Sequence, residues 1–401
     1  MQGDAAMPSG RAAWDAGPFS VSREPNLSRR FLRRKASNSV PVPERADALR
    51  RDLLWARNGI YWALHALGVG REDEILAPSY ICRAALDPAE HLGSRVTLYR
   101  ITGECRVDLA DLRARISPRA KAVIAAHYFG FPTQIGEIRE ICDARGLLLI
   151  EDCAHVLTGT SGGRSLGSFG DASVFSWRKV LPVFDGAHLI VSAPVRHPLP
   201  RMARQPLPME LRTLLNLAAR AATQESAPAL LQHGMRLISW LVSRRPKGMG
   251  GNAARPEMSA VDFSAALSLM PMSRVSAWLL RHSDLETIAA RRRENYRRLA
   301  GRLSGIPRIR LLHPELQDPT CPWILPMFVD GIPDAHFALR RQGIPAVTWG
   351  QVRPPQLRKG DFPEADHLYD NLVFLPVHQD MTDSHLDRII HAVRNIPGRA
   401  V

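Results

Sequence analysis

The sequence predicts an α/β protein with a three-layer large domain on a mostly parallel mixed sheet, and a smaller α+β domain at the carboxyl end. Short apolar runs without alternation, such as 122–126 and 147–150, are typical of strands that are buried on both faces. They alternate with amphipathic segments such as 135–145, and this order indicates right-handed crossovers between parallel strands. A chain of 401 residues is long enough for two domains.

The composition is that of a globular protein. Hydrophobic residues make up 45% and charged residues 23% of the chain. No apolar run reaches the roughly 20 residues that a membrane-spanning helix needs, and the amino terminus has no continuous apolar segment, so we expect a cytoplasmic protein. The five cysteines show no CxxC spacing, which favours free thiols over a disulfide framework or a zinc site.

The formal net charge of +14 is compatible with nucleic acid, a membrane surface or anionic substrates. The basic residues are spread along the chain and no nucleic-acid-binding motif accompanies them, so we expect no nucleic-acid partner. Contact with a membrane stays open, without a specific signal for it.

The chain divides into three regions. Residues 1–42 are polar and basic without apolar periodicity, which predicts a disordered tail. Residues 43–275 form the predicted large domain, with a helical insertion at about 200–250. Residues 276–401 form a predicted bridging helix and the small domain.

In the large domain, apolar spacing predicts helices on both sides of a break at 56–59, the second ending at Gly68. A helix over 107–116 has an acidic first turn and stops before Pro118, and a helix over 135–145 ends at Gly146. Unbroken apolar runs predict strands. These strands are expected at 74–80, 96–99, 122–126, 147–150, 172–177 and 187–191.

Towards the carboxyl end, mixed leucine and arginine patterns predict helices over 209–222 and 229–242 and a long helical stretch over 275–303. A strand is expected at 323–329 and a helix at 335–341. Thr382 is a suitable N-cap for a final helix over 383–394 with an acidic first turn.

The candidate chemistry lies at two strand ends. The run 147–150 ends in Glu151 and Asp152, and ligands of open α/β sheets bind just beyond the carboxyl ends of such strands. The run 172–177 brings Ser176 and Lys179 to what we expect is the same edge. A lysine and a carboxylate suit pyridoxal phosphate (PLP), which needs a Schiff-base lysine and a partner for its protonated pyridine nitrogen. A helix cap for Asp152 and a solvated charge for Lys179 are the alternatives.

Several motifs together resemble the DegT/StrS family of PLP-dependent sugar aminotransferases. They are IEDCAH from Ile150, a glycine-rich loop, SFGDASVFSWRK from Ser168, DG at 185–186 and LPVHQDMT from Leu375. The resemblance extends over about residues 50–400. It implies the aspartate-aminotransferase-like fold type I, a homodimer, Lys179 as the Schiff-base lysine and Asp152 as the partner of the pyridine nitrogen.

The same resemblance implies further cofactor contacts. Tyr80 is expected to stack on the pyridine ring, and His155 to lie beside the ring hydroxyl. Ser176 is expected to hold the phosphate together with a helix start, where free amides favour anions. That helix start is the group Arg57, Asn58 and Gly59. A core position for Tyr80 and an ordinary cap and turn at 57–59 are the alternatives.

Two departures from the family pattern qualify this interpretation. Members commonly have six positions from the motif phenylalanine to the lysine, whereas Phe175 to Lys179 spans four. No other lysine lies within the following sixty residues. The family asparagine that reaches the phosphate of a partner subunit is absent, and Arg255 is the candidate replacement.

The resemblance implies transfer of an amino group from an amino acid, expected to be glutamate, to a keto sugar that is linked to a nucleotide. Polysaccharide or secondary-metabolite biosynthesis is the expected setting. Two other functions stay open. Dehydratases of the family carry histidine in place of the lysine, so Lys179 argues against that reaction. A non-catalytic, regulatory member is the second alternative, because of the short lysine loop and the changed segment around Arg255.

Overall fold

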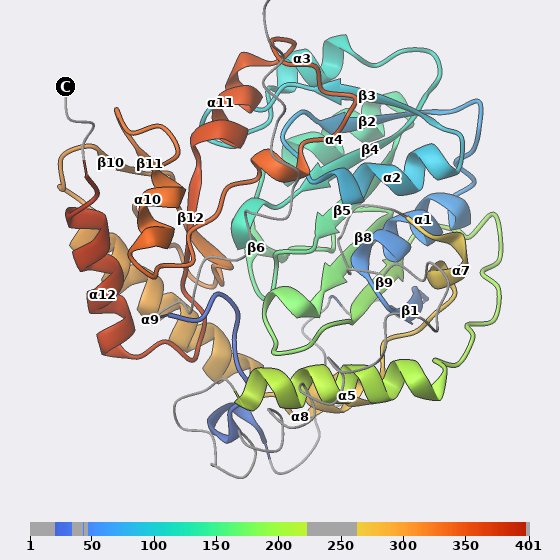
Figure 1. The fold of residues 1–401 in the computed structure, drawn as a ribbon. Coiled ribbons are helices and arrows are strands. Elements are labelled where there is room, and N and C mark those ends of the chain that lie inside the picture. The colour runs from blue at the N-terminus through green and yellow to red at the C-terminus, as the bar shows by residue number, and fades with distance from the viewer. Residues whose placement is uncertain (1–20, 34–42, 44–46, 223–262, 398–401) are drawn as a thin grey trace, which may run out of the picture.

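The computed structural model describes residues 21–33, 43, 47–222 and 263–397. Its main feature is a seven-stranded sheet with the strand order β1-β9-β8-β5-β4-β2-β3 (Figure 1). Strand β9 runs antiparallel to both of its neighbours, and all other neighbouring strands of the sheet run parallel to each other. The predicted mostly parallel mixed sheet is therefore confirmed. The strands are β1 Leu49–Leu53, β2 Glu74–Pro78, β3 Arg95–Tyr99, β4 Ala120–Ala126, β5 Leu148–Cys153, β8 Ala172–Ser176 and β9 Ala187–Val191.

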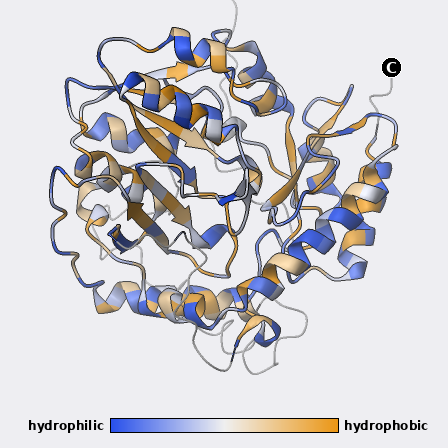
Figure 2. Ribbon diagram, turned by 180° about the vertical axis from the view of Figure 1, so that it is seen from behind, coloured by the Kyte–Doolittle hydropathy of each residue, from blue (hydrophilic) through white to orange (hydrophobic). Residues whose placement is uncertain are grey.

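Helices cover both faces of this sheet. From β1 through β2 to β3 the chain moves towards one edge, and from β3 through β4 to β5 it moves back. Right-handed crossovers therefore place the helices of the two halves on opposite faces, which gives three layers. The first pair is α1 Ala56–Ala66 and α2 Arg83–His91, and the second is α3 Leu109–Ala114 and α4 Ile135–Arg145. Figure 2 shows the apolar residues concentrated on the strands, between the helix layers.

The expected helix before the break at 56–59 is wrong. Residues 49–53 form β1, which pairs antiparallel with β9 over five residues at the sheet edge. A spacing of four between Leu49 and Leu53 fits a helix or a strand, and the pairing with β9 decides between them. Helix α1 begins at Ala56, so residues 57–59 lie inside its first turn.

A second, antiparallel sheet forms the core of the carboxyl-terminal part, in the order β10-β11-β12. Helix α9 packs on its strands and contacts α12. The predicted single helix over 275–303 is two helices, because the chain breaks at Ser283 and Asp284 caps α9 by accepting the Thr287 N–H at 3.2 Å. The elements are α8 Arg274–His282, α9 Leu285–Leu303, β10 Ile309–Leu311, β11 Ile324–Val329, α10 Ala335–Arg341, α11 Pro363–Asn371, β12 Val373–Pro376 and α12 Asp383–Arg394.

In the predicted insertion, α5 Leu207–Ala222 is confirmed, whereas the expected helix 229–242 and Arg255 lie outside the described residues. The remaining elements are short. They are η1 Arg29–Phe31, η2 Tyr128–Gly130, β6 Thr160–Ser161, β7 Arg164–Ser165, η3 Trp177–Lys179, α7 Ala265–Ser268 and η4 Gly350–Val352. In the described ranges, no helix combines the length and the apolar character that crossing a bilayer requires.

Part of the expected disordered tail is ordered. Within residues 21–33, Val21 and Phe31 are buried in the core, and the N–H of Asn26 donates to Asp380 at 2.9 Å. These two buried side chains and this hydrogen bond hold the segment against the rest of the protein. The sequence did not predict the contact, because the residues between the two apolar side chains are mostly polar. The rest of the tail, residues 1–20 and 34–42, lies outside the described residues, and the division into domains stays a prediction.

Candidate active site

The strand register brings the predicted residues to one edge of the large sheet. On β5, Asp152 lies opposite Val174 of β8. Two residues later on β8, Ser176 lies opposite Ala187 of β9, which in turn faces Leu53 at the end of β1. From this edge the chain continues into η3, which carries Lys179, and into the first turn of α1.

Asp152 is a carboxylate without a strong partner. Its Oδ1 accepts the Ala154 N–H at 3.0 Å, and no salt bridge joins it to a described cation. Burial raises the pKa of Asp152 above its usual value, while the Ala154 N–H and the charges of His127 and Lys179 lower it by less. The charged form is therefore poorly stabilised by the protein alone.

Lys179 lies at the end of η3 with its side chain half-buried. Its Nζ is 4.2 Å from the centre of the Trp323 ring, a cation–π contact, and we find no hydrogen bond from it to a described residue. Burial, helped by the neighbouring Arg178, lowers the pKa of Lys179 to about 8. An appreciable fraction of its amine is therefore uncharged, and nucleophilic, near neutral pH.

Lys179 acts electrostatically on Asp152 without touching it. The Lys179 ammonium lowers the pKa of Asp152, so the charges are within electrostatic reach. No hydrogen bond or salt bridge connects the two side chains, which stand on neighbouring strand ends. A carboxylate and an amine at one sheet edge, neither neutralised by the other, is the arrangement that the sequence predicted there.

His155 lies beside Lys179 against an aromatic ring. The imidazole stacks on Trp323 with ring centroids 4.2 Å apart and an angle of 14°. Its Nδ1 accepts the Phe129 N–H at 3.3 Å, so the proton of the neutral ring is on Nε2. Burial, together with the charge of Lys179, lowers the pKa of His155 well below its usual value, which makes it a neutral N–H donor.

Sequence reasoning missed Trp323 as a site residue. It lies just before β11 in the carboxyl-terminal part, and its N–H donates to the Phe129 carbonyl at 2.7 Å. Only the tertiary contact between the η2 loop and this strand places its ring at His155 and Lys179. No local motif in the sequence marks it.

Arg292 of α9, also missed, fixes the backbone around these side chains. Its buried guanidinium donates to the carbonyls of Val180 at 3.2 Å and Trp323 at 3.1 Å, and to the side-chain oxygen of Gln379 at 2.9 Å. Gln379 in turn donates to the Val180 carbonyl at 3.0 Å. The Arg292 guanidinium forms no salt bridge with a described carboxylate. It links the backbone of Val180, the residue after Lys179, to the backbone of Trp323, whose ring contacts the Lys179 amine.

Glu151 and His127 hold the glycine-rich loop on β5. The Glu151 carboxylate accepts three backbone N–H groups and faces His127 Nε2 at 3.1 Å. The three donors are Gly167 at 2.8 Å, Phe169 at 2.6 Å and Gly170 at 2.5 Å. His127, Glu151 and Cys153 form a group with the spacing of metal ligands. Because backbone donors already occupy the carboxylate, we interpret the group as a structural anchor.

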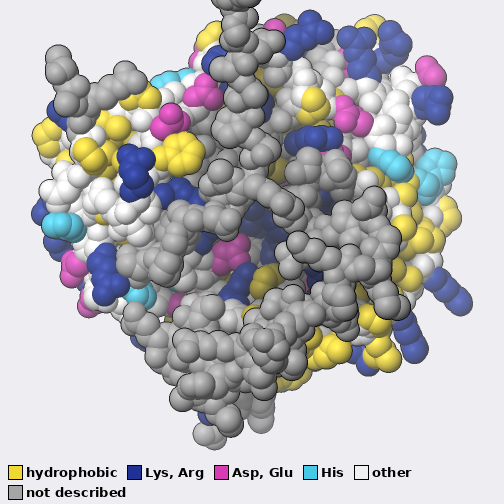
Figure 3. Space-filling view, viewed as in Figure 1, with side chains coloured by type: hydrophobic (Ala, Val, Ile, Leu, Met, Phe, Trp, Pro, Cys, Tyr) yellow, Lys and Arg dark blue, Asp and Glu magenta, His cyan; other side chains and the backbone are white. Residues whose placement is uncertain are grey.

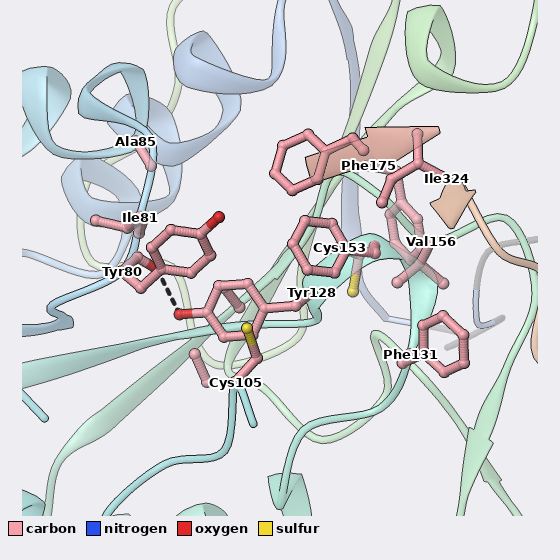
Figure 4. Close-up of a cluster of buried hydrophobic side chains, with 14 of the residues drawn as sticks. Tyr80, Ile81, Ala85, Cys105, Tyr128, Phe131, Cys153, Val156, Phe175 and Ile324 are labelled. Carbon is pink, nitrogen blue, oxygen red and sulfur yellow. Dashed lines mark hydrogen bonds between the residues drawn. The ribbon is translucent and has the colours of Figure 1, made fainter. Parts of the chain in front are cut away.

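Tyr80 is packed among other aromatic rings. Its ring is fully buried among Tyr128, Trp349 and Tyr369, with centroid distances of 5.6, 5.0 and 4.8 Å. Figure 4 shows the Tyr128 hydroxyl pointing to the Tyr80 carbonyl, which it reaches at 2.5 Å. This is the environment of a core tyrosine, the alternative to a ring that is open to a ligand.

The group at 57–59 packs α1 onto the sheet. The Asn58 amide donates to the Leu267 carbonyl at 2.9 Å, and Arg57 stacks on the Trp55 ring at 4.8 Å. A Cβ atom on Gly59 would lie 2.7 Å from a methyl carbon of Val174, so only glycine allows this close approach. The side chains thus have structural contacts, while the helix start that they form opens at the edge that carries Ser176.

Residues 56–194 match the model of the DegT/DnrJ/EryC1/StrS aminotransferase family. The GDP-perosamine synthase of Vibrio cholerae is 34% identical over 119 residues, which are 29% of this chain and 32% of that enzyme. The alignment thus spans about a third of the relative's length.

Two solved structures share the fold over most of both chains. The aminotransferase TlmJ of Streptoalloteichus hindustanus aligns with a TM-score of 0.59 at 21% identity, and covers 86% of this chain and 84% of its own. Spr1654 of Streptococcus pneumoniae, solved in its PLP form, aligns with a TM-score of 0.60 at 16% identity, and covers 86% of each chain. The predicted fold type I is therefore confirmed.

Proposed function

From the premise that residues 56–194 belong to the DegT/DnrJ/EryC1/StrS aminotransferase family, we propose that this chain is a PLP-dependent aminotransferase. We propose further that it transfers an amino group from an amino acid, glutamate first among the candidates, to a nucleotide-linked keto sugar. The observation that carries the proposal is the pair of Asp152 and Lys179, two charged groups at one sheet edge without a neutralising partner.

The residues of the site fit PLP. Asp152 has a raised pKa and no hydrogen bond from a cation among the described residues, and the N–H of a pyridinium would supply such a partner. Lys179 has a pKa of about 8, suited to attack on the cofactor aldehyde. Once bound, PLP supplies the electron sink that lets a proton leave the α-carbon of an amino acid.

The protein's own groups then divide the remaining work. Lys179 Nζ carries a proton between substrate positions as base and acid, for which a pKa near the working pH is favourable. His155 Nε2–H is available to a ring oxygen. Ser176 and the first turn of α1, formed by Arg57, Asn58 and Gly59, supply the phosphate-binding edge. Stacking by Tyr80 would require the aromatic cluster to open, and Trp323 is the ring already at the amine.

The sugar substrate is supported by relatedness alone. GDP-perosamine synthase is named after a nucleotide-linked amino sugar, and this chain aligns with about a third of that enzyme. By the same family resemblance we propose a homodimer, and the cytoplasmic setting expected from the sequence stays a prediction. A regulatory function without catalysis is the alternative. One argument for this alternative is the short loop between Phe175 and Lys179. Despite this short loop, Lys179 lies just after β8, which pairs with the strand that carries Asp152.

Spectroscopy on the purified full chain tests the proposal. With PLP the protein should show a visible absorbance band that glutamate abolishes as the cofactor takes up the amino group. Lys179→Ala should lose the band, whereas Lys121→Ala on β4 should keep it. A band that forms but does not respond to any amino donor would contradict the aminotransferase function. A screen of nucleotide-linked keto sugars, read as the mass change of amination, would then identify the acceptor.

A further inference from the structure

Helix α5 exposes an apolar stripe. Seven large apolar side chains are exposed in the described part of the chain, and four of them lie on this helix. Their exposed fractions are 77% for Leu207, 57% for Leu211, 49% for Leu214 and 39% for Leu215. Spacings of four, three and one residues put them on one side of a helix. Exposed leucines at this density mark an interaction surface.

The opposite side of α5 is fixed to the protein. Thr213 and Leu217 are buried beneath the helix. The Glu210 carboxylate accepts the Arg274 N–H at the start of α8, with both oxygens at 3.1 Å. Figure 1 shows α5 running along one margin of the molecule beside α8. The leucine stripe is therefore held outwards on a ridge and is not free to turn inwards.

The surroundings of the stripe are cationic. The segment 194–222 contains five arginines and a single acidic residue, Glu210. Four of the arginines are exposed, namely Arg196, Arg201, Arg204 and Arg212. Glu210 belongs to the inner side, where it binds the start of α8. Figure 3 shows hydrophobic side chains with Lys and Arg projecting beside them along the lower margin. The outer surface thus combines aliphatic side chains with positive charge.

We propose that α5 docks this protein on an anionic lipid bilayer, with the leucine stripe in the headgroup region and the arginines at the lipid phosphates. Interfacial helices have this combination of one apolar side, basic flanks and an orientation along the surface. Exposed, flexible leucine side chains on a single helix suit a deformable lipid surface. The proposal concerns a surface and does not depend on the chemistry at Lys179.

Charge argues against a second copy of the chain as the occupant. Pairing two such faces would bring arginines together, and the one acidic residue of α5 is on the other side. Like charges that face each other destabilise an interface. Binding to an anionic bilayer instead becomes stronger with each basic residue near the membrane surface.

Vesicle cosedimentation with the full chain tests the proposal. We expect binding to vesicles that contain phosphatidylglycerol, little binding to pure phosphatidylcholine, and weakening with salt. The double variant Leu211→Gln and Leu214→Gln removes apolar surface at unchanged charge and should weaken binding at least about tenfold. Phe337→Gln on α10 changes an apolar side chain that is 39% exposed and lies outside the stripe, so it is the control and should bind as the parent does.

Three results would overturn the proposal. One is failure of the parent chain to bind anionic vesicles, and another is equal binding by the leucine variant. The third is a change of molecular mass in light scattering when the leucines are replaced, which would assign the stripe to a second copy. Circular dichroism shows whether the variants are folded, and since both leucines are exposed, we expect that they are.

Discussion

The environment of Lys179 determines how its amine titrates. A buried ammonium loses hydration, and the neighbouring Arg178 adds repulsion, so the protonated form is disfavoured and the pKa falls to about 8. The positive charge of Lys179 in turn lowers the pKa of Asp152 and of His155. The protonation of Lys179 therefore influences both neighbouring groups at the sheet edge.

Competitive labelling with an amine reagent, read by peptide mass, measures this directly. Because the folded pKa is lowered, Lys179 should become reactive as the pH rises through about 8. Exposed Lys359, labelled in the same sample, serves as the reference for the activity of the reagent. Arg178→Ala removes a repulsive charge and should move the midpoint of Lys179 upwards. A midpoint of Lys179 at the unperturbed lysine value of about 10.4 would contradict the account.

At the same scale, the structure places Asp152, Ser176 and Lys179 at one edge of the sheet, where a rule about strand ends led us to expect them, since this rule needs only local patterns. The roles of these residues and of His155 towards PLP stay predictions. Tyr80 was harder, because whether an aromatic ring faces a ligand or the core depends on Trp349 and other rings from distant segments. Trp323 and Arg292 were not predictable, because their roles exist only through contacts between the two sheets.

Among the elements, the η2 loop shows how one glycine sets a contact. Gly130 has a φ of +94°, and a Cβ atom there would lie 2.3 Å from the Cys321 carbonyl oxygen. The loop can therefore lie against the segment 321–323, where the Trp323 N–H reaches Phe129. Glycine is required both by the backbone angle and by the space.

Gly130→Ala should accordingly lower the free energy of unfolding by about 2–4 kcal/mol. Gly136 in α4 is the matched control, because no atom lies within 4 Å of its Cβ position. Gly136→Ala should be neutral or stabilise by up to about 1 kcal/mol. Urea denaturation of both variants checks this, and equal stabilities would show that the loop accommodates a side chain.

The elements that the sequence predicted best have strong local signals. The helix over 135–145 and the helix over 383–394, capped by Thr382, were predicted with their observed bounds. Strand β1 was not, because five residues at a sheet edge have no decisive pattern without their partner β9. The break between α8 and α9 was missed because their apolar spacing continues across it, although Asp284 is a capping residue.

Across the whole molecule, the two sheets meet at the amine. Lys179 comes from the large sheet and Trp323 from the strand that enters the small sheet, and Arg292 binds the backbone on both sides. Burying the Arg292 charge among neutral hydrogen-bond acceptors costs free energy. The planar guanidinium can donate to several carbonyls at once, which a lysine ammonium cannot do in the same geometry. We therefore assign Arg292 as a positioning residue for Lys179.

Arg292→Met should loosen this junction, admit water to the amine and shift the labelling midpoint of Lys179 from about 8 towards the ordinary value. Arg292→Lys should restore this only in part. Arg297→Met, on the same helix with a salt bridge to Asp318, is the control and should leave the midpoint in place. A folded Arg292→Met variant with an unchanged midpoint would refute the positioning role.

The central claim is that PLP is held by Lys179 opposite Asp152. The direct test is to incubate the full chain with PLP, reduce it with borohydride and map the modified peptides by mass spectrometry. The chain has five lysines, at 35, 121, 179, 247 and 359. The account predicts one saturable adduct on Lys179, strongly weakened in Asp152→Asn. An adduct spread over the other lysines, or none on Lys179, would contradict it.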